Sequence, residues 1–250
     1  MTKLSVNVNK IATLRNTRSL EIPDLARLAT IALEAGAHGL TVHPRPDQRH
    51  IRPDDVATLS AVVKRFPHAE YNIEGNPFHG LVEHCQRVRP AQATLVPDTR
   101  EAFTSNHGFN LVEISASERQ ALSHAIATLH ASGCRVSLFL DPIPEMMPLA
   151  RSLGADRVEL YTEPYATAYR SGDAGQSIQT YARAATAARD AGLSVNAGHD
   201  LSLVNLGEFL RSVNPIAEVS IGHALIADAL EFGLAETVRR YLALCTGAGA

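Results

Sequence analysis

Residues 39–43 read GLTVH, a short strand-forming run that ends on a histidine. The same arrangement, an apolar run followed by a polar residue capable of chemistry, recurs five more times along the chain. The other runs are 4–8 before Asn9-Lys10, 71–73 before Glu74, 157–160 before Tyr161-Thr162, 193–196 before Gly198-His199, and 219–221 before Gly222-His223. Reactive residues at the carboxyl ends of successive strands are typical of the active-site face of a (β/α)8 barrel.

Strand and helix patterns alternate from one end of the chain to the other. Strands are expected near 4–8, 38–42, 69–74, 92–96, 135–140, 156–160, 193–196 and 217–221. Apolar spacings of three and four predict helices over 23–35, from 53 onward, and over about 78–88, 116–131, 143–153, 175–191, 202–212 and 224–244. Gly36, Gly133 and Gly192 stand where a left-handed residue would end a helix before the next strand. The sequence therefore predicts one α/β domain over residues 1–250, a (β/α)8 TIM barrel.

An open, doubly wound sheet is the alternative fold. It is disfavoured because no G-x-G-x-x-G follows the first strand, and because polar strand ends are spread over nearly all the units. Two strand-to-helix connections are long, from Pro97 to about Glu113 and from Tyr161 to about Gly175. Long loops on this face of a barrel often act as lids, and Gly172 and Gly175 are candidate hinges.

The composition argues against two classes of function, nucleic-acid binding and membrane spanning. A net charge of −3 gives no electrostatic case for binding nucleic acid. No apolar stretch approaches the roughly 20 residues that span a membrane, and the amino-terminus shows no signal-peptide pattern. Cys85, Cys134 and Cys245 have no metal-ligand spacing and fit a reducing compartment. We expect a cytoplasmic protein that acts on small molecules, without a membrane partner.

The ends of the last two strands suggest a phosphate site. Gly198 and Gly222 each precede a histidine where barrels often bind phosphate through backbone N–H groups at a helix N-terminus. His223 is interpreted as a residue that caps and positions the following helix. Ordinary strand-end turns are the alternative interpretation of both motifs.

Basic residues near the first two strands suggest a second anion site. Arg45 and Arg49 flank Asp47, with His50 directly behind, and Arg18 lies in the loop after the first strand. The planar guanidinium group suits phosphate. A surface loop whose charges satisfy one another is the alternative.

Three strand-end residues are the acid–base candidates, His43, Glu74 and His199. An imidazole exchanges protons near neutral pH, and a partly desolvated carboxyl group has a raised pKa. Glu159 lies inside a strand, so its charge requires either an ion pair with an arginine or Lys10, or a substrate contact. Lys10 itself could form a Schiff base with a keto substrate. No H-E-x-x-H or Cys/His quartet indicates a metal.

From about Leu4 to the last helix, the chain resembles the pyridoxine 5′-phosphate synthase family. The resemblance rests on VNVNKIATLRN at 6–16, TVHPRPDQRHI at 41–51, NIE at 72–74, VNAGH at 195–199 and IGHA at 221–224. The His-x-Arg-x-Asp-x-Arg-His-Ile string is the most specific of these. One departure stands out: better-known members end the first strand in Asp-His, where this chain has Asn9-Lys10, so Lys10 cannot repeat histidine chemistry there.

The resemblance implies a reaction. The family condenses 1-deoxy-D-xylulose 5-phosphate with 3-amino-2-oxopropyl phosphate and releases phosphate and water, without an organic cofactor or a metal. It makes His43, Glu74 and His199 the acid–base residues. The implied substrate and phosphate contacts are Asn7, Arg18, Arg45, His50, Gly198, Gly222 and His223, with Thr104 and Glu159 aligned less tightly. Homo-octamers built from dimers are also implied.

These implications suggest a separate proton-transfer role for each of the three acid–base residues. His43 would donate a proton as the carbinolamine loses water, Glu74 would remove protons from carbon and nitrogen, and His199 would assist ring closure. The two histidines could exchange roles. A Schiff-base aldolase that uses Lys10 and a phosphosugar-binding barrel without catalysis remain the alternative functions.

Overall fold

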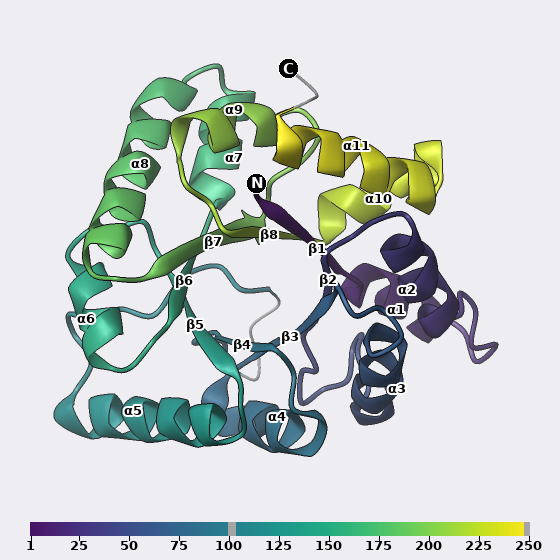
Figure 1. The fold of residues 1–250 in the computed structure, drawn as a ribbon, viewed down its shortest axis with the longest axis horizontal. Helices are drawn as coiled ribbons and strands as arrows, with labels where there is room; N and C mark the ends of the chain where they lie inside the picture. Colours follow the sequence, from purple (N-terminus) through teal and green to yellow (C-terminus); the bar gives the residue numbers. More distant parts are fainter. Residues whose placement is uncertain (100–103, 248–250) are drawn as a thin grey trace.

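Eight parallel strands close into a barrel in the computed structural model, which describes residues 1–99 and 104–247 (Figure 1). The strands are β1 (Lys3–Asn7), β2 (Gly39–Val42), β3 (Glu70–Gly75), β4 (Gln92–Leu95), β5 (Arg135–Leu140), β6 (Arg157–Leu160), β7 (Ser194–His199) and β8 (Glu218–Ile221). Each pairs with its neighbour in sequence, and β1 pairs with β8. The predicted barrel is confirmed, and the open sheet is excluded.

Helices surround the barrel, and most lie where the apolar spacing predicts them. They are α1 (Asn9–Asn16), α2 (Leu25–Glu34), α3 (Pro53–Val63), η1 (Pro77–Leu81), α4 (Val82–Val88), α5 (Ala116–Ala131), α6 (Met146–Ser152), α7 (Glu163–Arg170), α8 (Ala174–Asp190), α9 (Leu206–Ser212), α10 (His223–Phe232) and α11 (Leu234–Thr246). Gly36, Gly133 and Gly192 all have positive φ directly after a helix, as predicted.

Three details of the predicted helices were wrong. The expected helix over 224–244 is two helices, because Gly233 has a φ of 78° and separates α10 from α11. Helix α1 begins directly after β1, where no helix was predicted, so Lys10 lies in a first helical turn. Helix α7 occupies most of the connection from Tyr161 to Gly175, which corrects the expected long lid loop there. Part of the other predicted lid, residues 100–103, lies outside the described residues.

The apolar core lies between the sheet and the helices. In β1, Leu4 and Val6 are fully buried and belong to this core, while the alternate residue Ser5 hydrogen-bonds Thr41 of β2 at 2.7 Å. Thr41 in turn accepts a hydrogen bond from Asn72. Between β1, β2 and β3 the barrel interior therefore holds hydrogen-bonded polar side chains, where apolar residues usually dominate in this fold.

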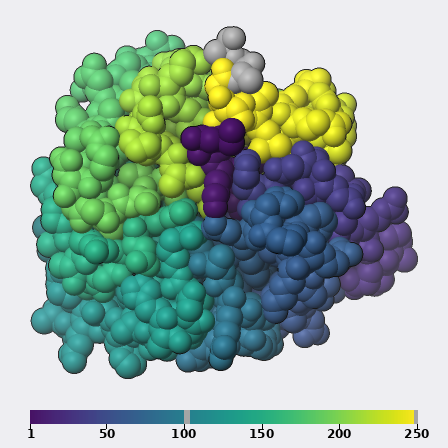
Figure 2. All heavy atoms as spheres, viewed as in Figure 1, coloured from purple at the N-terminus to yellow at the C-terminus, as the bar shows by residue number. Residues whose placement is uncertain are grey.

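The two ends of the chain meet on the barrel wall. Strand β1 pairs with β8, and α11 packs against β1. In Figure 2 the purple N-terminal residues lie beside the yellow C-terminal helix. In the ranges 1–99 and 104–247, the helices are all too short or too polar to serve as membrane spans.

Candidate active site

A cavity of about 490 Å³ opens at the carboxyl ends of the strands. This volume is typical of small-molecule sites. The predicted site residues that line it are Asn7, Lys10, His43, Arg45, Arg49, His50, Glu74, Thr104, Glu159, His199, Gly222 and His223. They come from both halves of the chain and from strands on opposite sides of the barrel.

Two predicted residues do not line this cavity. Arg18 is exposed in the connection between α1 and α2. Gly198 lies within β7, where an added Cβ would stand 2.1 Å from the backbone oxygen of Ser220. The glycine at 198 is thus required by the close approach of β7 to β8, independently of any phosphate.

His43 is a buried and neutral imidazole. It follows β2, is 7% exposed, and its backbone N–H donates to Oδ1 of Asn9 at 2.9 Å. Burial lowers the pKa of His43 to about 3, and the charges of Arg45 and His199 add to the effect. At neutral pH this ring therefore offers one donor and one acceptor nitrogen to a ligand.

His50 is also neutral, and its tautomer is defined. Its Nδ1 accepts a hydrogen bond from the backbone N–H of Ile51 at 2.9 Å, so Nε2 carries the proton. Burial, followed by the neighbouring His43, lowers the pKa of His50 to about 3. His50 is suited to donate a hydrogen bond into the cavity.

Glu74 gains and loses its proton near neutral pH. Burial raises the pKa of Glu74 to about 7, and the charges of Asp98 and Glu218 act in the same direction, whereas His199 opposes them. Nδ2 of Asn7 lies 3.4 Å from Oε2 of Glu74. A carboxyl group with this pKa can both accept and return a proton during turnover.

Of the two environments predicted for Glu159, an ion pair or a substrate contact, the ion pair is not formed among residues 1–99 and 104–247. Its side chain is 4% exposed, and Oε2 has no hydrogen-bond partner within the part of the chain that the structure describes. Burial, followed by the charge of Glu74, raises the pKa of Glu159 well above its usual value. Arg157 pairs instead with Glu218 at 3.6 Å, and Lys10 is exposed on α1. Glu159 is thus a buried carboxyl group at the cavity wall whose surroundings favour its neutral form.

His199 differs from the other two histidines because a carboxylate touches it. Its Nδ1 lies 2.6 Å from Oδ2 of Asp200, and its Nε2 lies 3.3 Å from Oγ1 of Thr104. Burial opposes the charged ring, but Asp200, Glu74 and Asp98 together outweigh burial, so the pKa of His199 is raised above its usual value. Of His43, His50 and His199, only His199 has surroundings that favour the imidazolium form.

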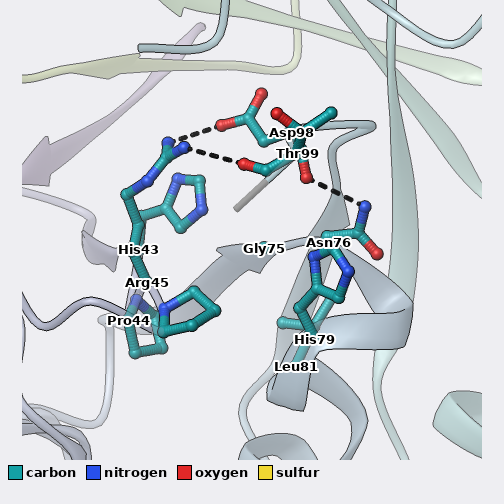
Figure 3. A pocket seen from close by; sticks show the side chains of 10 residues that line it. His43, Pro44, Arg45, Gly75, Asn76, His79, Leu81, Asp98 and Thr99 are labelled. Atoms are coloured by element: carbon teal, nitrogen blue, oxygen red, sulfur yellow. Dashed lines mark hydrogen bonds and ion pairs between the residues drawn. The ribbon is translucent and has the colours of Figure 1, made fainter. Parts of the chain in front are cut away.

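Arg45 is held by a carboxylate that the sequence interpretation missed. Its Nη1 lies 2.6 Å from Oδ2 of Asp98, and both side chains are 4% exposed (Figure 3). Asp98 also accepts from Ser105 at 2.7 Å, and its backbone oxygen accepts from Asn76 at 3.0 Å. Asp98 therefore links the ends of β2 and β3 to the connection after β4. No strand-end pattern marks it, because it lies three residues beyond β4.

Arg49 pairs with Asp47, as the alternative interpretation of this loop allowed. Its Nε donates to Oδ2 of Asp47 at 2.6 Å, and the hydrogen bond lowers the pKa of that carboxyl group. The Arg49 side chain is 30% exposed and lines the cavity. It therefore remains within reach of an anionic ligand.

The N-terminus of α10 faces the cavity. Gly222 takes the N-cap position and His223 is the first helical residue, so the prediction that His223 caps the helix was wrong. Both residues line the cavity. The backbone N–H groups of a first helical turn, together with the helix dipole, favour a bound anion. Across residues 1–99 and 104–247, no three His, Cys, Asp or Glu side chains are grouped as a metal site.

Comparison with known proteins decides the family. The family described as "Pyridoxal phosphate biosynthesis protein PdxJ" matches residues 4–247. The chain belongs to the PdxJ family. It is 52% identical over 248 residues to the pyridoxine 5′-phosphate synthase of Albidiferax ferrireducens, with 96% of each chain covered. The pyridoxine 5′-phosphate synthase of Xanthomonas campestris pv. campestris is 51% identical over 253 residues, covering 98% of this chain and 97% of the relative.

These matches confirm the resemblance stated from the sequence motifs, and with it the expectation of a pyridoxine 5′-phosphate synthase enzyme. Solved structures with little sequence similarity share only the fold. A thiamine phosphate pyrophosphorylase from Pyrococcus furiosus has a TM-score of 0.61 at 10% identity, covering 100% of this chain and 97% of its own. A phosphoribosyl anthranilate isomerase from Thermus thermophilus has a TM-score of 0.56 at 14% identity, covering 99% of this chain and 100% of its own.

Proposed function

We propose that the cavity binds 1-deoxy-D-xylulose 5-phosphate together with 3-amino-2-oxopropyl phosphate and joins them into pyridoxine 5′-phosphate, with loss of phosphate and water. The observation that carries this proposal is the meeting of Glu74, His43 and His199 around one cavity whose rim bears cationic groups. Fixing two reactants in one site can contribute roughly 7–11 kcal/mol toward the barrier.

Two separate anion sites support a substrate pair in which each member carries a phosphate. One is the N-terminus of α10 at Gly222 and His223. The other is the rim formed by Arg45, Arg49 and His50, which follows β2. Arg45 is already oriented by Asp98, so little side-chain entropy is lost when an anion binds there.

The protonation states suggest how the acid–base work is divided. Glu74, with a pKa of about 7, takes protons from carbon and nitrogen during the imine and enamine steps. His199 favours the charged ring and donates a proton to a departing hydroxyl group. His43 is neutral and accepts a proton or a hydrogen bond. This exchanges the roles first assigned to the two histidines.

The change Glu74→Gln tests the base directly. It keeps the size and one oxygen of the side chain but removes its ability to accept a proton. We expect kcat to fall by about 10²-fold or more, with the affinity for 1-deoxy-D-xylulose 5-phosphate changed by less than about threefold. Product absorbance and calorimetric titration measure the two effects.

The matched control for this test is Glu34→Gln, on an exposed residue at the end of α2. This variant should retain full turnover. Near-normal turnover of Glu74→Gln would reject Glu74 as the base. Wild-type protein that binds both phosphates without forming product would favour the binding-protein alternative.

The Schiff-base alternative depends on Lys10. Nucleophilic lysines are activated by desolvation or by nearby cations, whereas Lys10 is exposed at the cavity edge. Borohydride reduction with a keto phosphate, followed by peptide mass analysis, should give no adduct at Lys10. A stoichiometric adduct there would replace the acid–base scheme.

Assembly and location complete the proposal. We infer a homo-octamer built from dimers in the cytoplasm, working without an organic cofactor or metal and without nucleic-acid or membrane partners. Membership of the family supports the assembly. The three cysteines, all buried and unpaired, fit a reducing compartment.

A further inference from the structure

His199 and Asp200 are consecutive, yet their side chains touch. In an extended strand, successive side chains point to opposite faces. The backbone at His199, the last residue of β7, instead has a φ of 33°, in the left-handed region that non-glycine residues rarely adopt. This turn breaks the alternation and allows the Asp200 carboxylate to reach Nδ1 of the ring, 2.6 Å away.

The backbone of Asp200 is anchored on both sides. Its N–H donates to Oγ1 of Thr162 at 3.4 Å, and its carbonyl oxygen accepts from Nδ2 of Asn205 at the same distance. Thr162 also donates to the carbonyl oxygen of Gly198 at 2.6 Å. Thr162 is fully buried and Asn205 is 4% exposed, so the turn is fixed by groups within the fold.

We propose that Asp200 is a positioning residue, which holds the proton of His199 on Nδ1 and directs Nε2 into the cavity as the proton-transferring atom. The substrate side of this inference rests on the proposed function. A neutral imidazole has two tautomers, and the acceptor at Nδ1 selects the one whose Nε2 is free to take a proton. When the ring is charged, the same carboxylate stabilises the imidazolium.

Groups from several elements face His199. Asp200 is in contact with the ring, and the carboxyl groups of Glu74 in β3 and of Asp98 after β4 favour its charged form. The ring of Tyr161 lies edge-on at 6.2 Å, and His43 interacts with His199 electrostatically. Burial opposes the charge, and Asp200 makes the largest favourable contribution, so the pKa of His199 depends most on this one neighbour.

The change Asp200→Asn separates the charge from the shape of the side chain. Its amide oxygen still accepts from Nδ1, but the negative charge is gone. We expect the pKa of His199, followed by NMR of the imidazole in the free enzyme, to fall. We also expect the alkaline limb of the kcat profile to move to lower pH. The kcat should fall about tenfold or more above neutral pH and recover on acidification, with KM changed less than about twofold.

Two further variants complete the test. Asp200→Ala removes the acceptor as well, and should lower kcat further at every pH. Asp190→Asn, on an exposed residue at the end of α8, should leave both the His199 pKa and the kcat profile unchanged. An Asp200→Asn enzyme with an unshifted His199 pKa, or with a loss of kcat that is the same at every pH, would overturn the proposal. If the wild-type protein makes no product, the proposed function fails, and the NMR measurement alone still decides the pairing.

Discussion

His43 is a buried side chain whose charge state couples folding to pH. The unfolded chain would protonate this ring near pH 6.5, whereas the folded pKa is about 3. Between these values the unfolded state binds more protons than the folded state, so the free energy of unfolding rises with pH. The stabilisation is complete above pH 6.5 and is lost as the pH falls toward 3. His50 contributes in the same direction.

The variant His43→Asn should therefore flatten the acid side of the stability curve. We expect the slope of the unfolding free energy between pH 6 and pH 4 to decrease by up to about 1.4 kcal/mol per pH unit, measured by urea unfolding. His124→Asn, on an exposed residue of α5, is the matched control and should leave the curve in place. Equal slopes for His43→Asn and the parent protein would contradict the assigned burial effect.

Strands β7 and β8 show how one glycine determines the spacing of two elements. Residues 198 and 220 are paired in register, and the backbone of Ser220 leaves no room for a side chain at 198. The same close approach sets the position of His199, the next residue. A motif that resembles a phosphate loop in the sequence is thus also a packing requirement of the sheet.

The change Gly198→Ala should separate the two strands, because the new Cβ would lie 2.1 Å from a backbone oxygen. We expect a loss of about 1–3 kcal/mol or more in stability, together with a loss of turnover, since His199 is displaced. Gly175→Ala is the control: an added Cβ in α8 meets nothing within 4 Å, and stability should rise by about 0.4–1 kcal/mol. Chemical denaturation of both variants measures the difference. A Gly198→Ala protein as stable as its parent would refute the packing argument.

At the scale of the whole molecule, the connection from α1 to α2 extends away from the barrel (Figure 1). Leu20 and Ile22 in this connection are 61% and 68% exposed, and Leu14 of α1 is 54% exposed. Apolar side chains that are exposed close together mark surfaces for protein contacts. The segment is a candidate contact between copies in the proposed octamer.

Sedimentation of the purified protein should give a mass about eight times the 26.9 kDa of one chain. Leu20→Asp should shift the distribution to smaller species, because an interface cannot bury an unpaired carboxylate at low cost. Val112→Asp, which alters a residue 59% exposed before α5, is the control and should leave the mass unchanged. A monomeric parent protein, or an octamer indifferent to Leu20→Asp, would contradict this assignment.

The sequence by itself determined the order of the strands and the residues at their carboxyl ends. Alternation of apolar and polar residues, as in 4–8, is a local property of the sequence, so a strand can be recognised from it without knowing the fold. It predicts that His43, Glu74 and His199 lie on one face of the barrel. Helices α1 and α7 were missed, since each follows its strand too closely for the apolar spacing to separate them.

Only the tertiary structure decided the partners and the charges of these residues. Asp98 meets Arg45 from 53 positions away, and the charge of Glu74 acts on Glu159 and raises its pKa. The pKa of a buried group depends on desolvation and on neighbours a few ångströms away, and both are set by barrel closure. The sequence therefore identifies the reactive residues, while the three-dimensional packing sets their pKa values.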